Sequence, residues 1–145
     1  MSNGPIRYLD VSIVIEALVP GGQWHTKARH FFDSSLRTHS LCVPFCFWHH
    51  LWCGLYSLSR QNVLNHSQAK AIVKGLPNLL KTTTDIRYVE QAWHIAESTG
   101  AAHIAPLFYV AVAEHHLCEL WTASEMFPRR ACVKFIGDYA VPGTR

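Results

Sequence analysis

Three short stretches of the sequence carry side chains that could bind a metal ion. Asp10 ends the apolar run IRYLD and is followed by Ser12, while the pair His49-His50 lies in the apolar stretch FCFWHHLW. In ELWTASEMF, Ser124 and Glu125 follow a threonine. Hard cations such as Mg²⁺ need oxygen ligands. A set that mixes carboxylates with imidazole would suit Mn²⁺, Zn²⁺ or Fe²⁺ better than Mg²⁺.

Each of these residues also has a structural explanation. Asp10 has the right position to cap the helix that follows it, and the sequence leaves a cap and a metal ligand equally open. His50 on an apolar helix is most simply a core histidine with a hydrogen-bond partner. His103 is expected in a loop, as a further ligand, a phosphate contact or simply a solvated side chain. His115 and His116 are expected at a helix C-terminus, where positive charge is favourable.

The elements that must position these residues alternate along the chain. Apolar patterning and turn residues predict strands over 6–10, 40–44, 118–123 and 132–139, and helices over 11–19, 25–37, 45–60, 65–80, 86–100 and 106–116. This alternation predicts a three-layer α/β/α sandwich with a central, mostly parallel sheet. Ligands gather at the carboxyl ends of such strands, and all three stretches are expected there.

The same patterns predict which aromatic side chains are buried. We expect Trp48, Trp52, Trp93 and Trp121 in the core, and Val89 facing inward beside Trp93 on the helix over 86–100. Trp24 follows Gly21-Gly22 and is expected in an exposed loop. There it could stack on a base or pack at a dimer interface.

Composition limits the class of protein. The chain has 145 residues, which predicts one domain over 1–145. Apolar residues make up 49%, charged residues 16%, and the net charge is +3, so nucleic acid is permitted but not demanded and self-association is plausible. We expect the five cysteines to be free thiols rather than a zinc site. The sequence shows no apolar signal segment or membrane span, so we expect a cytoplasmic protein.

The order of these elements resembles the PIN-domain family, especially its small prokaryotic VapC-like toxin ribonucleases. The matching pieces are YLDVSIVIEAL, VPFCFWHHLWCGL, YVEQAWHIAESTG and PLFYVAVAEHHLCELWTASEMF. They span nearly the whole chain, and their order and spacing carry the resemblance more than any single motif. The resemblance implies a PIN-like fold and RNA cleavage with Mg²⁺ or Mn²⁺ held by three or four carboxylates.

Carried over position by position, the resemblance leaves one acid of four. Asp10 stands for the first acid, with Ser12 as the small hydroxyl after it. The second acid position holds His50, the third Pro106 (or Ala105), and the fourth Ser124. Glu16, one helical turn after Ser12, and Glu125 are the carboxylates that could substitute. The remaining acids are expected on the surface or the far side: Asp33, Asp85, Glu90, Glu97, Glu114, Glu119 and Asp138.

Three functions follow from this comparison. The first is a PIN-like domain with impaired or absent catalysis that acts by binding RNA or protein, with Asp10, Ser12, His50 and Ser124 marking the former catalytic site and no cofactor expected. The second is an active endoribonuclease that uses Mn²⁺ or Mg²⁺ in a site rebuilt from Asp10, His50 and Glu125. The third is an interaction module that forms a homodimer or binds a small antitoxin-like protein. Whether the chain is an enzyme stays open at this point.

Overall fold

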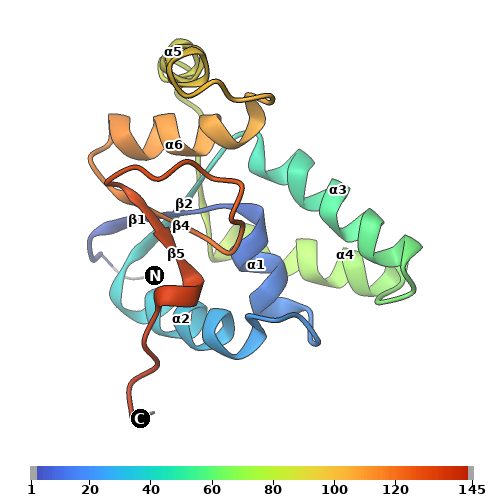
Figure 1. Ribbon diagram of the computed structural model, residues 1–145. Coiled ribbons are helices and arrows are strands. Elements are labelled where there is room, and N and C mark those ends of the chain that lie inside the picture. Colours follow the sequence, from blue (N-terminus) through green and yellow to red (C-terminus); the bar gives the residue numbers. More distant parts are fainter. Residues whose placement is uncertain (1–2, 144–145) are drawn as a thin grey trace.

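The computed structural model describes residues 3–143, and a fully parallel five-stranded sheet lies at its centre (Figure 1). Its strands are β1 (Ile6–Leu9), β2 (Ser40–Pro44), β3 (Lys81–Thr83), β4 (Glu119–Thr122) and β5 (Val133–Phe135), in the order β3-β2-β1-β4-β5. Every neighbouring pair is parallel. The predicted α/β/α sandwich with a mostly parallel sheet is therefore confirmed.

Helices cover both faces of this sheet (Figure 1). On one face lie α1 (Val11–Leu18) and α2 (His25–Thr38), and on the other lies α6 (Ala105–His115) with α5 (Val89–Thr99) outside it. The pair α3 (Phe47–Arg60) and α4 (His66–Gly75) packs beside α1. The described residues also contain two short 3₁₀ helices, η1 (Leu76–Asn78) and η2 (Ile136–Asp138).

Local chemistry explains where two of these helices begin and end. Asn65 and Gln68 form a reciprocal capping box at the start of α4. Gly100 ends α5 in the left-handed conformation, with φ 65°, which glycine adopts without steric cost. By contrast, α6 is buried nearly all round, because it lies between the sheet and α5.

The strand order places the switch point of the sheet between β1 and β4. The chain moves from β1 outward to β2 and β3 on one side, and β4 and β5 then extend the sheet on the other side. The N–H of Asp10 donates to the carbonyl of Trp121 at 3.2 Å, so the pairing of β1 with β4 continues to the residue after β1. Asp10 and Thr122 thus end adjacent strands where a doubly wound sheet forms its crevice.

Two predictions about core aromatic residues are wrong. Trp93 is 60% exposed and Trp52 40% exposed, and Val89 beside Trp93 is also exposed. The cause on α5 is that its contact with α6 is made by Ala92 and Ile95. Trp48 and Trp121 do pack against the core.

Trp24 is also more enclosed than predicted. Its ring packs edge-on against Phe135 at 5.4 Å, and the ammonium of Lys27 lies 5.7 Å from it. This half-buried ring is held by its neighbours, so it does not present a free face for stacking. Within residues 3–143, no helix combines the length and apolar character needed to cross a membrane.

A substitution of Leu120 in β4 tests whether this strand lies in the core. Its side chain is fully buried, so Leu120→Ala should lower the free energy of unfolding by about 2–5 kcal/mol through lost burial and the cavity left behind. Chemical denaturation measures this. The matched control is Leu117→Ala, because Leu117 is 94% exposed and its truncation should change stability by less than about 0.5 kcal/mol. Equal effects of the two substitutions would contradict the assignment.

Candidate functional site

A hydrogen-bond network joins Asp10 to the end of β4. The Ser12 hydroxyl donates to Asp10 Oδ1 at 2.6 Å and accepts the backbone N–H of Ala123 at 2.8 Å. It also lies 3.3 Å from Thr122 Oγ1. In turn, Thr122 Oγ1 accepts the N–H of Ser124 at 2.9 Å, which sets the turn after the strand. Asp10 and Ser124, the residues that the resemblance placed at the first and fourth acid positions, are therefore connected through Ser12 and Thr122.

Asp10 stands at the N-cap position of α1, with an extended backbone, but its side chain makes no capping hydrogen bond there. Its side chain instead binds Ser12 and is almost fully buried, with 6% of the residue exposed. Burial raises the pKa of this carboxyl to about 6, against the opposing effect of the Ser12 hydroxyl. A buried aspartate whose ionised form is destabilised in this way is typical of a functional position.

His50 points toward the same place from α3. Its Nδ1 lies 2.8 Å from the hydroxyl of Tyr109, a buried residue on α6. Burial lowers the pKa of His50, and the neighbouring His49 lowers it further, so the imidazole is neutral at pH 7. Burial also raises the pKa of Tyr109, so its phenol keeps its proton. One nitrogen of His50 is thus already engaged by the protein.

These groups line one cavity of about 330 Å³, called here the site cavity. Its polar members are Asp10, Ser12, His50, Tyr109 and Ser124, and its apolar members are Val11, Ile15, Ala105, Pro106 and Phe127. The structure therefore brings together Asp10, Ser12, His50 and Ser124, the four residues predicted for the catalytic site, together with Pro106. Four residues that the sequence interpretation did not single out also line it: Tyr109, Phe127, Val11 and Ile15.

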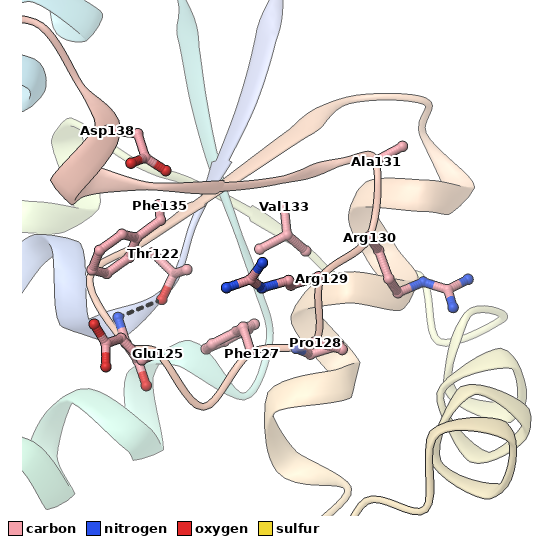
Figure 2. Close-up of a pocket in the computed structure, with 11 residues that line it drawn as sticks. Thr122, Glu125, Phe127, Pro128, Arg129, Arg130, Ala131, Val133, Phe135 and Asp138 are labelled. Atoms are coloured by element: carbon pink, nitrogen blue, oxygen red, sulfur yellow. Dashed lines mark hydrogen bonds between the residues drawn. The ribbon is translucent and has the colours of Figure 1, made fainter.

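Glu125 lies in a different place from the rest of the predicted ligand set. It is exposed and lines a second, larger cavity of about 950 Å³ beneath the loop between β4 and β5 (Figure 2). In Figure 2, Arg129 projects into this second cavity. Arg130 turns away from it and pairs with Glu114, with Nη2 at 3.1 Å from Oε2.

Glu16, the other possible substitute, is also engaged elsewhere. Its carboxylate accepts the backbone N–H of Trp24 at 2.9 Å, next to the start of α2. Among the histidines, His103 is exposed in a loop, and His116 stacks on Tyr8 with ring centroids 5.8 Å apart. Neither histidine lines the site cavity.

The residues of the site cavity do not fit a resident Mg²⁺ or Mn²⁺ ion. They supply one carboxylate, of which one oxygen accepts the Ser12 hydroxyl, and one imidazole, of which Nδ1 is bound to Tyr109 and Nε2 is the single nitrogen left for a ligand. Pro106 and Ser124, which line the same cavity, supply no carboxylate. Within residues 3–143, no three His, Cys, Asp or Glu side chains are grouped so that they could hold a metal ion. Such ions need several hard oxygen ligands to replace their water.

Parallel strands in this order, with the crevice between β1 and β4, define a PIN-like α/β/α domain. Comparison with solved structures supports this assignment. Over 85% of this chain, the structure resembles PAE2754 from Pyrobaculum aerophilum, with a TM-score of 0.64, 14% identity and 84% of that chain covered. Over 81% of this chain, it resembles Mycobacterium tuberculosis VapC20, a sarcin–ricin loop cleaving toxin, with a TM-score of 0.62, 16% identity and 88% of that chain covered.

These similarities establish the fold. At such low identity they carry no information about individual site residues. The sequence itself matches no protein-family model, and no curated protein matches it. The PIN-like architecture that the resemblance implied is therefore confirmed by structure, while the state of the active site rests on the residues of this chain alone.

The pH dependence of stability tests the environment of Asp10. Because its pKa is raised to about 6 in the folded protein, the folded state binds a proton more tightly than the unfolded state does. Protonated Asp10 therefore contributes to the free energy of unfolding in full below about pH 4. This contribution is lost as the pH rises through about 6 and the carboxyl ionises. Asp10→Asn should remove this loss, raising the free energy of unfolding at pH 7 by about 1–3 kcal/mol relative to wild type.

Denaturant unfolding at a series of pH values measures the effect. The matched control is Asp33→Asn, a carboxyl on α2 that lies outside the core and whose removal should leave the pH profile parallel to that of wild type. If Asp10→Asn also followed wild type at every pH, the carboxyl would not be buried as described.

Proposed function

We propose that residues 1–145 form one PIN-like domain in which nuclease catalysis is impaired or absent, and that the domain acts by binding another macromolecule. The observation that carries this proposal is the site cavity, where the buried carboxylate of Asp10 is the single acid among the ten lining residues. The nuclease mechanism implied by the fold needs an ion to activate water and to neutralise the phosphate. This site offers too little negative charge to hold one.

The chemistry that remains in the site cavity is hydrogen bonding. The Ser12 hydroxyl is committed to Asp10 and to the backbone of the residue after β4, and the His50–Tyr109 pair is neutral. These groups hold three elements, α1, α3 and α6, around the cavity. In the proposed function, they maintain the shape of the domain and form no part of a reaction.

A protein partner is the favoured ligand, because the domain exposes several large apolar side chains on its helices, among them Trp52, Tyr56 and Trp93. Trp52 and Tyr56 lie one turn apart on α3, and exposed apolar side chains grouped in this way are typical of interaction surfaces, whereas Trp93 lies on α5. The partners that the resemblance implies are a second copy of the chain and a small antitoxin-like protein. A cytoplasmic location stays a prediction.

RNA is the second candidate, and one observation favours it. Arg129 projects into the cavity of about 950 Å³ that adjoins Ser124, and within residues 3–143 no acid pairs with it. A guanidinium in that position could bind a phosphate of a strand that crosses the former active site. Glu125 and Asp138 line the same cavity and would weaken such binding.

Two measurements test the proposal together, an RNA cleavage assay and a titration with Mn²⁺. Purified protein should not cleave a sarcin–ricin loop RNA, used as the probe because VapC20 cleaves that loop, in Mg²⁺ or Mn²⁺ above the rate of the Asp10→Asn variant. Titration calorimetry with Mn²⁺ should give no heat of binding. Cleavage that depends on Asp10, or on His50 and Glu125 with Mn²⁺, would establish the active enzyme instead.

A variant with the acids returned provides the matched control. His50→Glu, Pro106→Asp and Ser124→Asp place carboxylates at the three positions that the resemblance assigns to acids. The triple variant should bind Mn²⁺ at least about tenfold more tightly than wild type, because several converging oxygens can replace the water of the ion. If wild type and the triple variant bound Mn²⁺ equally, the missing acids would not be the reason for inactivity.

A further inference from the structure

Two consecutive arginines in the loop between β4 and β5 point in opposite directions. Arg130 turns outward and pairs with Glu114 on α6, with Nη2 at 3.1 Å from Oε2. Arg129 instead projects into the cavity of about 950 Å³ beneath the loop (Figure 2). This cavity, called here the loop cavity, is lined by residues from the segment 122–138. Within residues 3–143, the Arg129 side chain forms no ion pair and no hydrogen bond.

Two carboxylates in the loop cavity are unpaired as well. Glu125 lies just after β4 and Asp138 lies in η2, and both line the cavity together with Arg129. In Figure 2, the two acids lie on the side of Phe135, away from the point where Arg129 enters. Among the described residues, neither acid forms an ion pair, with Arg129 or with any other cation. The loop cavity therefore presents opposite charges that the protein keeps apart.

The wall of the loop cavity that carries Asp138 is fixed by contacts outside it. Phe135 packs edge-on against Trp24, with ring centroids 5.4 Å apart, and Lys27 Nζ donates to the carbonyl of Gly137 at 2.6 Å. Only glycine fits at position 137, because an added Cβ would overlap the edge of the Phe135 ring. These contacts hold η2 against the end of β5, so this wall is formed before any ligand binds.

The rest of the lining is largely apolar. Phe127, Val133 and Phe135 line the same cavity as the three charged groups. Rings and methyl groups of this kind suit the alkyl chain of a ligand, and the face of an aromatic ring also attracts a guanidinium or an ammonium group. The chemistry of the cavity thus fits a small molecule that carries opposite charges on an alkyl chain.

We propose that the loop cavity binds a free basic amino acid, with arginine as the best match. The unpaired groups of the cavity are one cation and two anions, whereas free arginine carries one carboxylate and two cationic groups. The guanidinium of Arg129 binds the ligand carboxylate in the two-pronged geometry that suits this pair. Glu125 and Asp138 bind the α-ammonium and the guanidinium of the ligand.

An RNA strand fits the loop cavity less well. Its phosphates bring negative charge only, and they would meet two acids beside the single unpaired arginine. The acids that weaken phosphate binding are the same groups that favour a basic amino acid. This inference goes beyond the proposed function, because it needs neither a macromolecular partner nor the site cavity.

The geometry also sets the expected affinity. Small-ligand pockets measure roughly 300–1,000 Å³, so the loop cavity, at about 950 Å³, holds an amino acid together with water. All three charged side chains are exposed, and exposed ion pairs contribute little each. The dissociation constant should therefore be on the order of 1 mM, and binding should weaken as the salt concentration rises.

Titration of isotope-labelled protein with L-arginine, followed by amide NMR spectra, tests the proposal. Signals of residues 122–138 should shift, while those of β3 at the far edge of the sheet should not. Three analogues each lack one charge: citrulline lacks the guanidinium charge, argininamide the carboxylate and Nα-acetylarginine the α-ammonium. Each should bind about threefold more weakly or worse, because each loses one exposed ion pair.

Variants of the protein identify which side chain binds which group. Arg129→Gln should weaken arginine binding about threefold or more but leave argininamide binding unchanged, because argininamide has no carboxylate to lose. Glu125→Gln combined with Asp138→Asn should abolish the preference for arginine over citrulline. The matched control is Arg37→Gln, an exposed arginine on α2 that does not line the loop cavity, which should bind arginine as wild type does. Circular dichroism melting curves confirm that each variant is folded.

Four results would overturn the proposal. They are amide signals that do not change at any arginine concentration, equal binding of arginine and its three analogues, arginine binding that Arg129→Gln leaves unchanged, and a short RNA that shifts the same signals more strongly than arginine. The last result would assign the loop cavity to a phosphate strand. None of these readouts involves a metal ion or RNA cleavage, so failure here and failure of the proposed function are distinguishable.

Discussion

The candidate site depends on one constraint, the burial of the Asp10 carboxyl between β1 and β4. Its hydrogen bond with Ser12, and the bond that Ser12 accepts from Ala123, connect the first crossover of the fold with the last strand pair. The Ser12 hydroxyl thus contacts one oxygen of the Asp10 carboxylate and the backbone after β4 at the same time.

The apolar surroundings of Asp10 bear on stability as well as on chemistry. Several acids packed around an empty metal site repel one another and depend on the ion for compensation. Here His50 is neutral and bound to Tyr109, and Pro106 brings no charge at all. Among the residues of the site cavity, the ionised Asp10 carboxyl alone destabilises the folded protein, because burial raises its pKa. A site cavity with a single carboxyl agrees with the proposed binding function, in which the domain acts through its shape and surface.

Much of the fold could be predicted from the sequence, because periodicity reports which face of an element is buried. The buried faces of α1 and α3 and the end of α5 at Gly100 follow from such patterns. The failures at Trp52 and Trp93 have a physical cause. Periodicity identifies an apolar face, but it does not tell whether the same protein or a second one covers it.

The site was predictable in part, for a similar reason. The carboxyl ends of parallel strands predicted that Asp10 and the residues after Thr122 lie close together, and the resemblance assigned Ser12, His50 and Ser124 to the same site. Tyr109 could have been found, since it lies three residues after Pro106 and so on the same side of α6. The separation of Glu125 from Asp10 could not, because it depends on the turn that Thr122 sets through the N–H of Ser124.

The most direct test of the central claim is an anomalous difference map from crystals of the wild-type protein grown with Mn²⁺. The account predicts no manganese peak within coordination distance of Asp10, because one half-engaged carboxylate cannot strip a divalent cation of its water. A well-occupied peak bound by Asp10 together with His50 or Glu125 would contradict the account and restore the metal-dependent nuclease.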